Sequence, residues 1–217
     1  LSFGCCNGEG LGSPEVPGAY GEDVASIEVK TRPTAPTISM IEGDGTGDDA
    51  NDFTQCGGKV TFTIQNPDSN NELSLDDLLI ELPLPPGYTY DDSVAPEWSY
   101  SGSGAALRTA AGGELNQGSG ETEPVEAGNS LFWSGENNAT QNGNIPDSKA
   151  IVYPQETIEI SLFLKADGNC DTNPDSNPAV PSFTQALDVS YADSCGNTYS
   201  QSDSLSINPE APRLLMS

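Results

Sequence analysis

An oxygen-bearing side chain occupies every second position of the stretch DGNCDTNPDSN, residues 167 to 177. Alternate residues of an extended backbone project to the same side, so these side chains are placed to converge. They are Asp167, Asn169, Asp171, Asn173, Asp175 and Asn177. Carboxylate and amide oxygens are the ligands that calcium prefers. The spacing therefore predicts a calcium site, and the alternative is a solvated turn rich in Asn and Asp.

This stretch matches only the beginning of an EF-hand loop. Asp167, Asn169 and Asp171 fit the first three alternating ligands of that template. Position six of the template requires glycine and here holds Thr172, and position twelve requires a bidentate glutamate and here holds Pro178. The predicted site is therefore a loop site rather than an EF-hand.

A second candidate calcium site lies in the stretch GDGTGDDANDF. Its glycines give the backbone enough freedom to wrap an ion. The acids available there as ligands are Asp44, Asp48, Asp49 and Asp52.

The charge of the 217-residue chain limits its partners. Seven Lys and Arg residues stand against 33 Asp and Glu residues, which gives a formal net charge of −26. Such a charge repels nucleic acid and anionic membrane surfaces, so neither is an expected partner. Two environments tolerate the self-repulsion: molar salt, where screening shortens its range to about 3 Å, and calcium-containing extracellular fluid.

Histidine is absent from the chain, which argues against an enzyme. The commonest general base and any Ser/His or Cys/His nucleophile pair are thereby excluded. A hydrolase using paired carboxylates is the remaining enzymatic alternative, but with 33 acids some close pairs arise by chance. No motif supports it.

The five cysteines occur in no CxxC motif and have no histidine to complete a zinc site. They predict disulfides formed in an oxidising compartment. The sequence begins at Leu1 and contains no apolar run near 18 residues, from which we expect a removed signal peptide and no membrane insertion. These features together predict an extracellular or cell-surface location.

Short runs of alternating apolar residues predict an all-β fold. They occur in ASIEVKT, TISMI, KVTFTIQN, LDDLLIELP, SLFWSG, ETIEISLFLKAD and the hairpin ALDVSYADSCGNTYSQSDSLSIN. No segment shows ten residues of helical periodicity. We expect an irregular N-terminal arm at 1–23, a β-sandwich at 24–208 with a long exposed insertion at 101–130, and a C-terminal tail at 209–217.

The order of four of these segments resembles a known repeat. The segments are IEVKT, GGKVTFTIQNPDSNNELSLDDLLIELPLPPGYTY, VYPQETIEISLFLKAD and ALDVSYADSCGNTYSQSDSLSI. They resemble the conserved immunoglobulin-like repeat of prokaryotic surface proteins, domain of unknown function eleven, from about Ile27 to Ile207. The resemblance implies a non-catalytic immunoglobulin-like β-sandwich that serves as a stalk, S-layer, adhesin or fibre module.

The expected sandwich topology sorts the cysteines. If 59–65 and 157–165 are antiparallel neighbours, Cys56 precedes one strand and Cys170 follows the other, so the two lie close together. Cys195 falls at the opposite end, and its expected partner is Cys5 or Cys6. The remaining thiol either bonds to another subunit or stays free or modified.

Two further motifs have a structural and a functional interpretation. Trp98 and Trp133, with Tyr100 and Phe132 nearby in sequence, form either part of the core, which we favour, or a platform for sugars. Asn138 begins the only glycosylation sequon, in a polar stretch expected to be exposed.

These features predict an extracellular structural protein that assembles with itself into a filament, pilus-like fibre or S-layer. We expect strand exchange between subunits, with ASIEVKT or the apolar end PRLLMS completing the sheet edge of a neighbour. The alternative is a carbohydrate-binding or adhesive module whose aromatic residues contact glycans.

Overall fold

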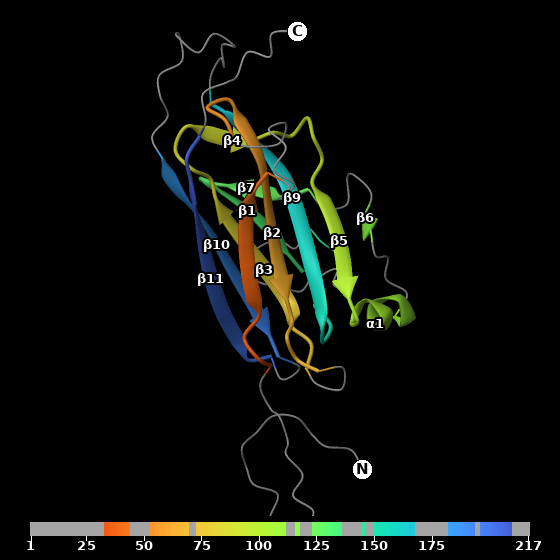
Figure 1. Ribbon diagram of the computed structural model, residues 1–217. Coiled ribbons are helices and arrows are strands. Elements are labelled where there is room, and N and C mark those ends of the chain that lie inside the picture. The colour runs from red at the N-terminus through yellow and green to blue at the C-terminus, as the bar shows by residue number, and fades with distance from the viewer. Residues whose placement is uncertain are drawn as a thin grey trace, which may run out of the picture.

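A computed structural model describes residues 33–43, 53–69, 73–111, 116–117, 123–135, 145, 150–167, 182–193 and 196–209. Its strands form two antiparallel sheets packed face to face, with β2 and β9 in front of β3 and β10 (Figure 1). The prediction of an all-β antiparallel sandwich is confirmed. No helix in the described ranges has the length and apolar character needed to cross a membrane.

The first sheet has β9 at its centre. Its strand order is β1 (Thr37–Glu42), β2 (Gly57–Gln65), β9 (Glu156–Ala166), β5 (Glu97–Gly102) and β6 (Asn116–Gln117). The short β4 (Tyr88–Tyr90) pairs with the end of β9, beyond the part that pairs with β5. The predicted antiparallel pairing of 59–65 with 157–165 is confirmed.

The second sheet ends in the predicted C-terminal hairpin. Its strand order is β11 (Thr198–Ile207), β10 (Phe183–Ala192), β3 (Asp76–Pro83), β8 (Ser130–Ser134) and β7 (Val125–Ala127). The ladder between β10 and β11 runs without a bulge from Phe183 opposite Ile207 to Ala192 opposite Thr198.

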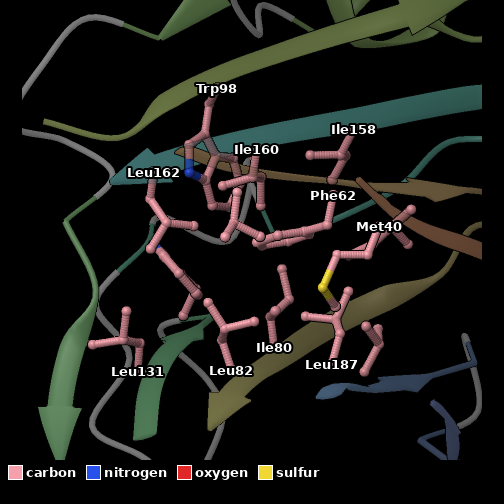
Figure 2. Packing of buried hydrophobic residues seen from close by; sticks show 14 of the residues in the cluster. Met40, Phe62, Ile80, Leu82, Trp98, Leu131, Ile158, Ile160, Leu162 and Leu187 are labelled. Atoms are coloured by element: carbon pink, nitrogen blue, oxygen red, sulfur yellow. The ribbon is translucent and has the colours of Figure 1, made fainter. Parts of the chain in front are cut away.

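The core lies between the sheets, where the apolar sides of the strands meet (Figure 2). Phe62, Ile160 and Leu162 of the first sheet face Ile80 and Leu82 of the second. Each of these side chains is buried, whereas their sequence neighbours are mostly less covered, as the period of two in a strand requires. The sequence pattern therefore identified the core positions of these strands.

Of the two strands predicted near the N-terminus, TISMI and ASIEVKT, the structure describes only the first. The run TISMI is part of β1, and its Met40 enters the core. The strand expected in ASIEVKT lies outside the described residues, as do the N-terminal arm and the end of the C-terminal tail.

The insertion predicted at 101–130 is exposed over most of its described residues, but it contains regular structure and a few buried residues. This segment begins with the end of β5, continues into α1 (Ala105–Ala110), and later forms β7. Arg108 of α1 is only 1% exposed. The prediction rested on the small side chains of this segment. In the structure these side chains allow α1 to approach the sheet closely enough to bury a charged residue.

Arg108 forms a buried ion pair with Glu156, the first residue of β9. The guanidinium Nε and one terminal nitrogen donate to the two carboxylate oxygens of Glu156, at 2.7 and 2.9 Å. The guanidinium also lies over the Tyr100 ring, 3.6 Å from its centroid. The backbone N–H of Tyr153 donates to the same carboxylate at 3.0 Å. These contacts fasten α1 to the end of the first sheet.

Gly104 permits this close approach. A Cβ atom at this position would lie 2.1 Å from the carbonyl oxygen of Pro154 and 2.7 Å from the backbone nitrogen of Glu156. Both are backbone atoms, so they do not move aside as a flexible side chain would. Only glycine fits where α1 begins.

Replacing Arg108 with Met is expected to lower the free energy of unfolding by about 3–5 kcal/mol, because the buried Glu156 carboxylate loses its counter-charge. The double variant Arg108→Met/Glu156→Leu is expected to recover most of this loss, since no buried charge remains. Urea unfolding measures both. The control is Glu97→Gln, which removes the exposed Lys59–Glu97 pair and is expected to lose less than about 1 kcal/mol. If Arg108→Met lowers the free energy of unfolding no more than the control does, the buried ion pair between Arg108 and Glu156 is contradicted.

Candidate functional site

Of the nine acids and amides predicted as principal calcium ligands, the structure describes only Asp167. It follows β9, is exposed, and its backbone N–H donates to the carbonyl of Gly87 at 2.7 Å. The others lie outside the described residues: Asn169, Asp171, Asn173, Asp175, Asp44, Asp48, Asp49 and Asp52. In the described ranges, no three His, Cys, Asp or Glu side chains are grouped so that they could hold a metal ion. Both calcium sites stay predictions.

Cys56 is disulfide-bonded, and its partner lies outside the described residues. Its carbonyl accepts a hydrogen bond from the N–H of Ala166, the last residue of β9, at 2.9 Å. The chain therefore leaves β9 beside Cys56, four residues before Cys170. The glycosylation candidate Asn138 and the cysteines Cys5, Cys6, Cys170 and Cys195 lie outside the described residues.

The two tryptophans belong to the core. Trp98 is 2% exposed and Trp133 is 0% exposed. Trp133 packs edge-on against Phe62, with ring centroids 5.9 Å apart, and Trp98 lies 6.4 Å from Tyr100. The favoured core interpretation is confirmed. A sugar platform built on Trp98 or Trp133 is wrong, because neither ring has a face open to a ligand.

The edge strands of the two sheets are the surfaces where another chain could bind through backbone hydrogen bonds. A strand at a sheet edge presents unpaired N–H and C=O groups to another chain. The four terminal strands are β6 and β7, with two and three residues, and β1 and β11, with six and ten residues. Very short edge strands resist pairing. The two longer ones, β1 and β11, are therefore the candidate sites.

β1 and β11 lie on the same side of the sandwich (Figure 1). They contact each other, but each pairs with only one neighbour among the described strands. β1 follows Pro33 and Pro36, and its Ile41 is 42% exposed. Prolines next to an edge strand limit pairing there, whereas an exposed apolar side chain favours it.

Among the described residues, β11 has one feature that protects an edge strand, the inward-facing Asp203, and it lacks proline, basic residues and a bulge. Between Thr198 and Ile207 it contains no proline, lysine or arginine, and Asp203 is its one charged residue. Its outward side carries only small hydroxyl side chains, all exposed, namely Thr198, Ser200, Ser202, Ser204 and Ser206. Because β11 is long, regular and nearly uncharged, it is the strand best suited to accept another strand.

The inner side of β11 is only partly covered. Tyr199 stacks near Tyr191, with ring centroids 5.6 Å apart, and both Tyr199 and Leu205 are half-buried. Gln201 is exposed and Asp203 is half-buried. These side chains retain surface that an additional strand would cover. The sequence predicted the hairpin, but its position at an edge depends on strand order, which the pattern does not contain.

Three acids gather where β3 begins and β10 ends. Asp193 is buried and accepts hydrogen bonds from the N–H and side-chain amide of Asn197 and from the Tyr199 hydroxyl, at 2.9, 2.8 and 3.0 Å. Burial, together with the negative charges of Asp193 and Asp77, raises the pKa of Asp76 above its ordinary value. This cluster closes the turn of the hairpin.

No family model and no curated relative matches the chain. Solved structures with a similar fold include BcpA, the major pilin subunit of Bacillus cereus, with a TM-score of 0.49 and 7% identity over 80% of this chain and 40% of that one. Another is the full-length major pilin SpaD of Corynebacterium diphtheriae, with a TM-score of 0.47 and 11% identity over 79% of this chain and 35% of that one. A collagen-binding domain from a Staphylococcus aureus adhesin has a TM-score of 0.36 and 12% identity over 79% and 98%. The chain spans less than half the length of the two pilins. Likenesses this low carry no argument about function.

Asp76→Asn is expected to raise the free energy of unfolding near neutral pH. A raised pKa in the folded state means that Asp76 favours folding below its ordinary pKa of 3.8 and that this contribution is lost as the pH rises through the folded value. The gain from the substitution is therefore largest near about pH 7 and disappears below about pH 4. Urea unfolding across this range measures it. Glu126→Gln on exposed β7 controls for net charge, and an equal gain from that variant would contradict the prediction.

A Cys56–Cys170 disulfide is expected in the oxidised protein, because Ala166 lies beside Cys56 at the end of β9. Proteolysis without reductant, followed by mass spectrometry, identifies the linked peptides. A Cys56 peptide linked instead to Cys5, Cys6 or Cys195 would show that the prediction is wrong.

Proposed function

We propose that this chain is a non-enzymatic structural subunit of an extracellular or cell-surface assembly, such as a filament, pilus-like fibre or S-layer. Its subunits join by main-chain pairing at sheet edges. The observation that carries the proposal is the long, regular and nearly uncharged edge strand β11, next to β1, which also pairs with only one neighbour among the strands that the structure describes. Such edges bind strands of another chain through backbone hydrogen bonds.

Strand exchange supplies one contact in this proposal. The donor is ASIEVKT at 25–31 or PRLLMS at 212–217, and both lie outside the described residues. Alternating side chains of the donor would fit between those of the acceptor, which gives specificity beyond the backbone bonds. The six-residue β1 is similar in length to either donor, and its exposed Ile41 offers an apolar contact beside the edge.

The large negative charge sets the conditions for assembly. Subunits with a net charge of −26 repel one another in dilute buffer. The range of this repulsion falls from about 10 Å at 0.1 M salt to about 3 Å at 1 M, so we expect edge pairing to become stronger as the salt concentration rises. Calcium at the predicted loops would act in the same direction by neutralising carboxylates.

The test is sedimentation and negative-stain microscopy of the purified full chain over a range of NaCl, with calcium or with chelator. We expect oligomers or filaments whose amount increases with salt and with calcium. A chain without residues 1–32 is the matched variant, because it lacks the donor at 25–31 and keeps every described strand. A full chain that stays monomeric in high salt and calcium, with 24–32 paired inside its own domain, would overturn the proposal.

A further inference from the structure

We propose that the edge of β11 that faces away from β10, which pairs with no other described strand, binds β11 of a second copy, antiparallel, about a two-fold axis that passes through Ser202. The result is one continuous sheet formed from the second sheets of both copies. This inference rests on the proposed function and names the partner for one of its two edges. It follows from the order of side chains along β11.

The two-fold axis restricts which residues can face each other. In an antiparallel pair, residues directly opposite project to the same side of the sheet. In β11 the even-numbered residues project outward and the odd-numbered ones inward, as shown by the inward Tyr199 and the buried Ile207. Even residues must therefore face even residues, so the axis passes through a single residue rather than between two.

An axis at Ser202 makes the strand self-complementary over 198–206. Gln201 then faces Asp203 of the second copy, so an amide donor meets each carboxylate. Tyr199 faces Leu205 of the second copy, which pairs an aromatic with an aliphatic side chain. On the outward side every pair is hydroxyl to hydroxyl, from Thr198 facing Ser206 to Ser202 facing itself.

The neighbouring registers fit less well. An axis at residue 203 places the two Asp203 carboxylates directly opposite each other, which is destabilising. An axis at residue 201 places Asp203 opposite Tyr199 and moves Leu205 opposite Asn197, beyond the start of the strand. Only the axis at Ser202 uses the strand from Thr198 to Ser206 and keeps the carboxylates apart.

The local charge of this edge permits contact between two acidic molecules. β11 itself brings one carboxylate per copy to the contact, and the Ser202 hydroxyl on the axis donates to the Asp188 carboxylate of β10 at 2.6 Å, which occupies the side of Ser202 away from the second copy. The remaining repulsion acts over longer distances and is screened by salt. The pair is therefore expected to form at high ionic strength.

This contact closes on itself and so gives a dimer, because a two-fold contact uses the same surface of both subunits. Growth into a polymer then requires a different second contact. The candidate is strand exchange at β1, which contacts β11 on the same side of the sandwich, so the donor strand would lie next to the β11 pair. The β11 pair and strand exchange at β1 are thus two separate contacts of one assembly.

Cysteine cross-linking of the full chain tests the register. Under mild oxidation in high salt, Ser202→Cys is expected to form a 202–202 disulfide between copies, because opposite Cβ atoms lie about 4.5–5.5 Å apart. Ser204→Cys is the matched control on the same side of the strand. Its two copies would be about 14 Å apart along the strand, which is too far for a disulfide. Mass spectrometry of mixed isotope-labelled and unlabelled protein separates these links from those of the native cysteines.

Charge substitutions test the same register without added cysteines. Gln201→Asp places two carboxylates opposite each other twice per dimer, so the dissociation constant is expected to rise roughly tenfold. Gln201→Lys places opposite charges there and is expected to lower it. Val94→Asp and Val94→Lys make the same changes in net charge at an exposed site in the turn between β4 and β5. Sedimentation at fixed salt measures all four variants, and equal effects at 94 and 201 would overturn the inference.

The outcomes separate this inference from the proposed function. Assembly without a 202–202 link, or with equal linking at 204, overturns the β11 pair and leaves edge assembly standing. If removal of 1–32 abolishes all association, the occupant of the β11 edge is a donor strand and the inference is wrong. A dimer that persists without 1–32 and links at 202 supports it. A full chain that is monomeric under every condition overturns both.

Discussion

The burial of one side of β9 is the interaction on which the rest of the structure depends. β9 pairs with β2 along one edge and with both β4 and β5 along the other. Its inward residues Ile158, Ile160, Leu162 and Leu164 are all buried against the second sheet. A slip of one residue would move this whole set to the outer side of the sheet, so the register of four strands is fixed together. The positions of the outer strands, including β1, follow from it.

The interior also contains a buried ion pair, at the first residue of β9. Glu156 begins β9, and Arg108 reaches it from α1, a segment that interrupts the succession of strands. The pair is enclosed by the Tyr100 ring and by the backbone N–H of Tyr153, so both charged groups have partners where water is excluded. A buried pair of this kind adds little net stability compared with apolar packing, but it admits few alternative arrangements. The ion pair therefore fixes the position of α1, the segment that follows β5, against the start of β9.

The sequence predicted the parts of this fold that depend on local alternation and missed those that depend on strand order. Val60, Phe62 and Ile64 alternate with polar residues, and all three are in the core. By contrast, nothing local distinguishes the polar pattern of β11 from that of a covered strand, so its place at an edge became visible only with the sheet assembled. Arg108 was missed because it lies among Gly, Ser and Ala residues. The one signal in the sequence was that 101–130 contains an arginine, Arg108, although the whole chain has only seven basic residues.

The regular ladder between β10 and β11 has a mechanical consequence. Its ten residue pairs run in register from Phe183 opposite Ile207 to Ala192 opposite Thr198. Tension applied along the strand direction acts on all of these hydrogen bonds at once, in shear, whereas tension applied across the ladder would open them one after another. A fibre whose axis follows β11 would therefore extend far less readily under load than one whose axis crosses it.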